Sequence, residues 1–241
     1  MMTKIEKLKD DLKVYYRVTR TPLLGLLVAF PLLVIYEVLS FTPAFDRSYP
    51  VRGFTDQVFR TLIENLGIHT PSAVGGAVLL GIFVAFLWQK ESLRDFQIHH
   101  VPLMLLESML YGLSLSILVT WFASDLTLST FQRTADQYRV AIAFGAGFYE
   151  ELLFRAFFFG VSALTLQKLF RIQSKLVYVV TALFSSMLFY KAHTFGGIGL
   201  APYSRIFLFA FGMLLCGIYY KRGLGIAAWT HTIYNVFIII A

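Results

Sequence analysis

The sequence has 241 residues, of which 57% are hydrophobic and 15% are charged, and its formal net charge is +7 at pH 7. A soluble domain carries about 25% charged residues, so this composition excludes a protein whose whole surface faces water. With a mean hydropathy of +0.67, the sequence predicts an integral membrane protein in contact with the lipid bilayer. The basic residues lie mainly between apolar runs, which favours lipid headgroups as their partners, and no nucleic acid is expected to bind.

The 20 N-terminal residues carry six basic side chains with apolar residues between them. The basic residues are Lys4, Lys7, Lys9, Lys13, Arg17 and Arg20. This pattern fits a basic amphipathic helix on the membrane surface, and it fits a solvated tail equally well. The segment is too charged for a cleavable signal peptide, so the apolar run after it is expected to remain as the first membrane span.

Apolar runs of about the 20 residues that a bilayer requires recur after this segment. We predict membrane spans near residues 21–42, 73–89, 101–123, 139–163, 176–193, 204–220 and 224–241. Seven is the expected number, in a range of six to eight. Apolar residues at helical spacing within residues 43–72 also predict a short interfacial helix. Lys and Arg residues are more numerous on the side of the N-terminus, which predicts that the N-terminus is cytoplasmic.

The expected fold is all-α: a polytopic membrane helical bundle with a central polar cavity, formed by a single domain over residues 1–241. Glu37 and Glu107 occur singly within apolar runs, where either a structural or a direct functional role is possible. Cys216 lies in an apolar run and is expected to be a small apolar filler. Three histidines in polar connectors are expected to be solvated: His69, His99 and His100.

Three ionisable residues, Glu150, Glu151 and Arg155, interrupt the apolar run 139–163. A charge inside a membrane helix costs about 2.5–3.5 kcal/mol on insertion scales, so such a cluster needs partners. Residues four apart share a helix face, which predicts an ion pair between Glu151 and Arg155. Glu150 points to a different face and lacks that partner. We therefore identify Glu150 as the candidate general base or acid.

Two later spans carry polar pairs with the same spacing of four residues. Phe189 and His193 share a face at the end of one span, and His231 and Asn235 share a face of the last span. Taken alone, each pair is compatible with capping or interhelical packing. Together with Glu150 they supply a carboxylate, an imidazole and two hydrogen-bond donors. Water attack on an amide carbonyl requires this set of groups.

At these positions the sequence resembles the CAAX prenyl protease and bacteriocin-processing family of intramembrane glutamic proteases, which includes Abi-type proteins. The family motifs Glu-Glu-x-x-x-Arg, Phe-x-x-x-His and His-x-x-x-Asn occur in this order on three spans. They are carried by Glu150, Glu151 and Arg155, by Phe189 and His193, and by His231 and Asn235. The segment from Phe211–Gly212 through Gly217 to Tyr219, Arg222 and Gly223 is also similar. The resemblance covers about residues 140–237, and it departs from the family at Ala156, where many members have Gly.

The resemblance implies an intramembrane endopeptidase that uses no cofactor and no metal. Glu150 and His193 would activate a water molecule, and His231 and Asn235 would hold the oxyanion that forms on the peptide carbonyl. The implied structural supports of the site are Glu151, Arg155 and Phe189. A bilayer-embedded site favours a membrane-anchored or lipidated peptide as substrate. We expect a multi-pass protein of a prokaryotic inner or plasma membrane.

Two alternatives stay open at this point. A zinc-dependent membrane protease would gather the same glutamates and histidines from different helices, although the sequence contains no linear His-Glu-x-x-His. A non-catalytic membrane scaffold or immunity protein would use the same fold for binding. Loss of one catalytic position would favour this second alternative, and none is missing from the sequence.

Overall fold

The computed structural model describes residues 4–40, 52–69, 73–122, 136–194 and 202–240, and every element within them is helical. This finding confirms the predicted all-α fold class. The elements in chain order are α1 (Lys4–Thr19), α2 (Pro22–Ser40), α3 (Phe54–Asn65), α4 (Ala73–Gln89), η1 (Lys90–Leu93), α5 (His100–Phe122), α7 (Asp136–Gly145), η2 (Ala146–Val161), α8 (Ser162–Lys168), α9 (Leu176–Thr194), α10 (Pro202–Arg222) and α11 (Leu224–Ile240).

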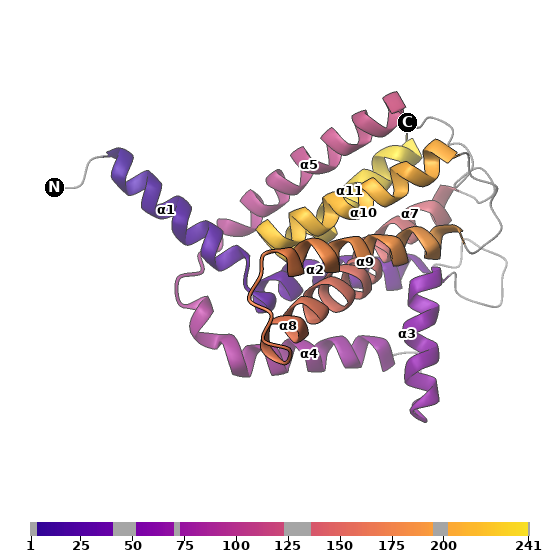
Figure 1. Ribbon diagram of the computed structural model, residues 1–241, viewed down its shortest axis with the longest axis horizontal. Helices are drawn as coiled ribbons and strands as arrows, with labels where there is room; N and C mark the ends of the chain where they lie inside the picture. The colour runs from indigo at the N-terminus through magenta and orange to yellow at the C-terminus, as the bar shows by residue number, and fades with distance from the viewer. Residues whose placement is uncertain (1–3, 41–51, 70–72, 123–135, 195–201, 241) are drawn as a thin grey trace.

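The central helix of the bundle is α11, which packs against α5, η2, α2, α10 and α7. Figure 1 shows α5, α11 and α10 running side by side, with α9 next to α10. Ala227 and Ala228 of α11 are completely buried. Small side chains let neighbouring backbones approach, which is how membrane helices pack closely. The approach to α2 is especially tight, because a Cβ added at Gly225 would lie 3.2 Å from the backbone oxygen of Gly25.

Three helices in the described part of the chain are long and apolar enough to cross a membrane: Pro22–Ser40, His100–Val119 and Leu176–Thr194. Each coincides with one predicted span. Two shorter apolar helices, Val74–Gln89 and Leu224–Ile239, coincide with two further predicted spans. The remaining two predicted spans are also helical, in the run from α7 to α8 and in α10. The protein is therefore an integral membrane protein, and the number of seven spans stays a prediction.

A long π-helix occupies the middle of the continuous run formed by α7, η2 and α8, where η2 has 16 residues. The i→i+5 turn of a π-helix is rare and frequently occurs at functional sites. Ser185 of α9 supports this turn, because its hydroxyl donates a hydrogen bond of 2.6 Å to the backbone oxygen of Phe154. Gly147 allows η2 to approach α11, since a Cβ there would lie 1.8 Å from the hydroxyl oxygen of Thr232.

Helix α3 forms within residues 43–72, as predicted, and ion pairs connect it to the end of α2. Asp56 is 1% exposed and pairs with Arg52 at 3.4 Å and with Arg60 at 2.8 Å. Both arginines also pair with Glu37, at 2.9 and 2.8 Å. The Tyr36 hydroxyl donates to Asp56 at 2.8 Å. Glu37 is therefore part of a structural ion cluster, and residues 43–51 and 70–72 of the predicted segment lie outside the described residues.

Helix α1 is attached to the bundle at its C-terminal end, while its N-terminal end projects outward (Figure 1). Glu107 of α5 accepts hydrogen bonds from the guanidinium of Arg222, at 2.5 and 2.8 Å, and from the Tyr15 hydroxyl at 2.8 Å. The guanidinium lies 4.0 Å over the ring of Tyr16. Burial, aided by the Glu107 carboxylate, raises the pKa of the Tyr15 phenol, which stays a donor at neutral pH. The end of α1 is thus packed, and Glu107 has a structural role.

The prediction for one connector histidine was wrong. His100 is 3% exposed, and its ring lies 5.6 Å from that of Tyr15, because α1 covers the beginning of α5. His69 and His99 are exposed, as predicted. Cys216 is 1% exposed within a cluster of apolar residues, which confirms its place as a filler.

Candidate active site

Glu151 and Arg155 of η2 lie in the interior of the bundle, and both side chains are completely buried. Glu151 Oε1 is 3.0 Å from Arg155 Nη1, so the ion pair predicted from the spacing of four is confirmed. The Arg155 guanidinium also lies 4.4 Å over the ring of Phe189 from α9. A buried charge without a partner is strongly destabilising, and a guanidinium is further stabilised over an aromatic face. Phe189 therefore contributes to holding the buried pair.

His231 of α11 joins the two glutamates. Its Nδ1 lies 2.8 Å from Glu151 Oε1, and its Nε2 lies 3.9 Å from Glu150 Oε2. An ionised carboxylate only accepts hydrogen bonds, so Nδ1 carries a proton and donates it to Glu151. Both carboxylates thus reach one imidazole, each at a different ring nitrogen.

His193 at the end of α9 also approaches Glu150, with its Nε2 at 3.6 Å from Glu150 Oε2. Its Nδ1 lies 2.9 Å from the backbone oxygen of Phe189, so Nδ1 carries the proton and donates it to that carbonyl. The rings of Phe189 and His193 are 4.3 Å apart between centroids. The predicted shared face of these two residues is confirmed, and their contact fixes the direction of the imidazole.

Three atoms converge as a result: Glu150 Oε2 and the Nε2 atoms of His193 and His231. In a neutral imidazole whose Nδ1 is protonated, Nε2 is an acceptor, and so is a carboxylate oxygen. Three acceptors can share one place only if a proton or a donor molecule lies between them. Separations of 3.6 and 3.9 Å exceed a direct hydrogen bond and suit a bridging water. The arrangement is able to bind and polarise water.

The two sides of this group differ in exposure. The side chains of Glu151 and Arg155 are 0% exposed and that of His231 is 3% exposed, whereas Glu150 is 14% and His193 is 28% exposed. The Oε2 atom of Glu150 is itself buried and accepts no hydrogen bond from the described residues. A sealed supporting side therefore lies behind a more accessible side that contains Glu150 and His193.

Asn235 lies one turn after His231 on α11 and is 9% exposed. Within the described part of the chain, no hydrogen bond connects it to Glu150, His193 or His231. The structure thus brings three of the four predicted catalytic residues together and leaves Asn235 as a buried neighbour. Its predicted contact with an oxyanion stays a prediction.

Three contacts around the site were missed by sequence reasoning. The Glu151–His231 hydrogen bond joins helices 80 residues apart, and no spacing indicates such a contact. The ring of Phe211 lies 5.3 Å from that of His231, on the α10 segment whose glycines were noted in the sequence. The Tyr149 hydroxyl lies 3.4 Å from Glu37 Oε1, which links the residue before Glu150 to the α3 ion cluster. In the sequence, only the position of Tyr149 next to Glu150 indicated that Tyr149 could matter to the site.

The zinc alternative requires a set of ligands around one point. Among the described residues, no group of three or more His, Cys, Asp or Glu side chains is arranged so that it would hold a metal ion. Chelation is the direct test of whether the site depends on a metal ion.

Residues 138–237 match the family model Rce1-like, described as type II CAAX prenyl endopeptidase Rce1-like. The matched region runs from α7 to α11 and contains every residue of the site, from Glu150 to Asn235. It also coincides with the residues 140–237 that carry the resemblance seen in the sequence. No curated protein and no solved structure matches the chain.

Proposed function

We propose that the chain is a membrane-embedded glutamic endopeptidase, on the premise that residues 138–237 match the family model of CAAX prenyl endopeptidases. The observation that supports the mechanism best is the position of Glu150 Oε2, 3.6 Å from one imidazole Nε2 and 3.9 Å from another. A water molecule needs about two to four polar partners in a protein interior, and these three atoms supply them.

In the proposed first step, Glu150 removes a proton from a water that His193 helps to orient, while His231 is an imidazolium that carries both of its ring protons from the outset. The resulting hydroxide adds to the carbonyl carbon of the scissile peptide bond, and the carbonyl electron pair moves onto oxygen. Glu150 then gives its proton to the amide nitrogen as the carbon–nitrogen bond breaks. The products are a carboxylic acid and an amine. A positioned general base of this kind contributes about 10²–10⁴-fold in rate.

In the same proposal, His231 and Asn235 stabilise the oxyanion of the tetrahedral intermediate. His231 donates from Nε2 only when it is doubly protonated, because its Nδ1 proton is already directed at Glu151. The buried Glu151 carboxylate compensates the positive charge of that imidazolium. Glu151 therefore acts as a positioning residue, and Arg155 is its partner in the buried ion pair.

A site enclosed by membrane helices favours a substrate that is itself held in the membrane. We propose a membrane-anchored or lipidated peptide as the substrate of this single, multi-pass membrane domain, and a prokaryotic inner or plasma membrane as its location. The CAAX prenyl endopeptidase description belongs to the family, and it makes a prenylated C-terminal peptide the first substrate to test.

The test uses the purified full-length protein in lipid nanodiscs. An internally quenched peptide with a farnesylated Cys-aliphatic-aliphatic-X end is compared with the same peptide without the lipid, and products are identified by mass spectrometry. We expect faster cleavage of the lipidated peptide and an unchanged rate after EDTA treatment. Activity that EDTA abolishes and added zinc restores supports the zinc alternative. Absence of cleavage for lipidated, unlipidated and hydrophobic leader peptides alike supports the scaffold alternative.

A further inference from the structure

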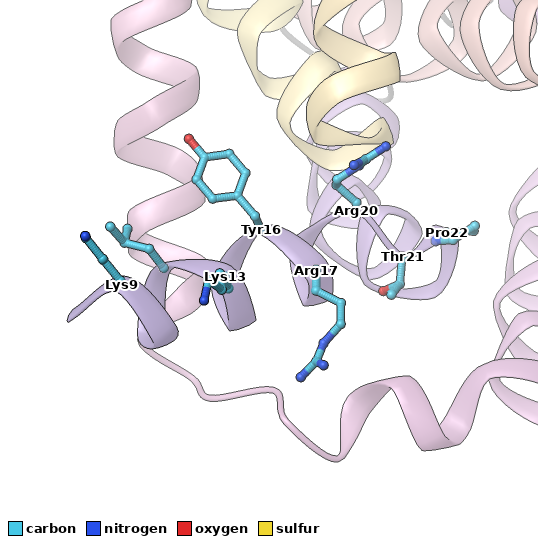
Figure 2. Close-up of a pocket in the computed structure, with 8 residues that line it drawn as sticks. Lys9, Lys13, Tyr16, Arg17, Arg20, Thr21 and Pro22 are labelled. Carbon is cyan, nitrogen blue, oxygen red and sulfur yellow. The ribbon is translucent and has the colours of Figure 1, made fainter. Parts of the chain in front are cut away.

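A basic hollow lies at the junction of α1 and α2 and shares no residue with the proposed active site (Figure 2). Its volume is about 860 Å³, which lies within the usual range of roughly 300–1,000 Å³ for sites that bind small molecules. The residues that line it are Lys9, Leu12, Lys13, Tyr16, Arg17, Arg20, Thr21 and Pro22.

Four cationic side chains line one face of this hollow. Lys13 and Arg17 follow Lys9 at intervals of four and eight residues, which places these three on one side of α1, and Arg20 comes directly after the end of the helix. Among the described residues, no carboxylate belongs to the lining. The hollow therefore presents a concentrated positive charge on a helix that also carries acidic residues elsewhere.

Two of these cations already have acidic neighbours. Lys13 pairs with Asp10 at 3.0 Å, and Arg17 pairs with Asp95, but all four side chains in these pairs are more than half exposed. Exposed ion pairs contribute only about 0–1 kcal/mol, so an incoming anion with several negatively charged oxygens competes with them readily. The cations remain available to such a ligand.

The back of the hollow is fixed to the bundle. Arg20 donates a hydrogen bond of 3.0 Å to the backbone oxygen of Tyr220, and Figure 2 shows its side chain directed toward the helix end drawn in yellow. The ring of Tyr16 lies 4.0 Å from the guanidinium carbon of Arg222. These contacts hold the lining in place, which reduces the entropy lost when a ligand binds.

The hollow also lies directly before a helix of membrane-spanning length. Pro22 is its last lining residue and the first residue of α2, one of the helices long and apolar enough to cross a membrane. Leu12 and Tyr16 are both 48% exposed beside the cations, and Leu8 is 60% exposed. A charged group flanked by exposed apolar side chains, directly before a membrane span, matches the chemistry of a phospholipid headgroup and the start of its acyl chains.

We propose that this hollow binds one anionic phospholipid, with its phosphate and headgroup among Lys9, Lys13 and Arg20 and its acyl chains along Leu12 and Tyr16. Such a site differs from the general attraction of a basic segment to an anionic membrane. It predicts a fixed stoichiometry and a dependence on particular lysines. The proposal is independent of the proteolytic function.

The test uses the full-length protein in neutral detergent micelles that contain equal amounts of phosphatidylglycerol and phosphatidylcholine. Native mass spectrometry counts the lipids retained on the wild type and on the variant Lys9→Gln/Lys13→Gln. Both lysines are exposed, and retained helicity in circular dichroism checks that the variant is folded. Lys7→Gln is the matched control, because Lys7 is exposed on the same helix but points about 160° away from Lys9.

We expect one phosphatidylglycerol to be retained in preference to phosphatidylcholine by the wild type and by Lys7→Gln. The double variant should lose this preference, with binding weaker by roughly fivefold for each lysine removed. Equal weakening by Lys7→Gln would show diffuse electrostatic attraction and overturn the proposal. Equal retention of the two lipids by the wild type would also overturn it. Displacement of the lipid by millimolar inorganic phosphate would identify a simple anion site instead.

Discussion

His231 is held by Glu151, whose Oε1 lies 2.8 Å from Nδ1, while its other nitrogen lies 3.9 Å from Glu150 Oε2. One imidazole therefore connects a sealed ion pair with the more accessible carboxylate. The two adjacent glutamates have different tasks in this arrangement: Glu151 orients the ring, and Glu150 is left for a proton transfer. This division leads to separate expectations for stability and for activity.

Replacing Arg155 with Met should destabilise the protein, because it leaves the carboxylate of Glu151 buried and unpaired. Breaking a buried pair in this way costs about 3–5 kcal/mol. The measurement is the midpoint of thermal unfolding in detergent, with retained helicity at low temperature. A midpoint equal to that of the wild type would contradict the structural role of this pair.

The double variant Glu151→Leu/Arg155→Met separates stability from function. Removing both charges should restore most of the stability lost in Arg155→Met, since an apolar replacement of a buried pair is often neutral. Activity should stay low, because His231 no longer has an acceptor for its Nδ1 proton. Recovery of full peptide hydrolysis together with stability would show that Glu151 does not position His231.

The close contact between η2 and α11 should depend on Gly147. Gly147→Ala places a methyl group 1.8 Å from the Thr232 hydroxyl oxygen, so the helices must separate and move His231 away from the glutamates. We expect about 1–3 kcal/mol lower stability and a marked loss of activity. Gly217→Ala on α10 is the matched control, because its Cβ would meet nothing within 4 Å. The control should be neutral or stabilised by up to about 1 kcal/mol, and equal effects of the two variants would contradict this packing.

Attachment of α1 should depend on Arg222. In Arg222→Met, Glu107 loses the guanidinium and Tyr16 loses its cationic partner. Hydrogen bonds to charged groups contribute about 1.5–3 kcal/mol, so amide exchange in Lys4–Thr19 should accelerate by at least roughly tenfold. Hydrogen exchange with mass spectrometry measures this change. The neighbouring exposed Lys221→Met is the control, and unchanged exchange in Arg222→Met would refute the attachment.

The sequence predicted the local features of the site well because they depend on helix periodicity. The spacing of four residues identified the Glu151–Arg155 pair and the Phe189–His193 contact, and the structure has both. The same periodicity assumed a regular α-helix, whereas both glutamates lie on the π-helix η2. Nothing in the sequence of η2 signals a 16-residue π-helix, since this turn is stabilised by contacts from other helices such as that of Ser185.

Contacts between distant helices were beyond the reach of the sequence. Glu37 and Glu107 looked alike as lone carboxylates in apolar runs, and their arginine partners are 15 and 115 residues away. The buried position of His100 likewise depends on α1 packing over α5. In each case the tertiary fold decides whether a polar group is solvated or paired, and composition and spacing carry no signal for it.

The substitution Glu150→Gln tests the central claim most directly, because it keeps the shape of the side chain and removes its ability to accept a proton. Hydrolysis of the cleavable peptide is measured for the wild type, Glu150→Gln and Glu64→Gln, the last being an exposed control on α3. We predict that Glu150→Gln stays folded and loses about 10²–10⁴-fold in kcat, while Glu64→Gln is unaffected. Full activity of folded Glu150→Gln would contradict the account.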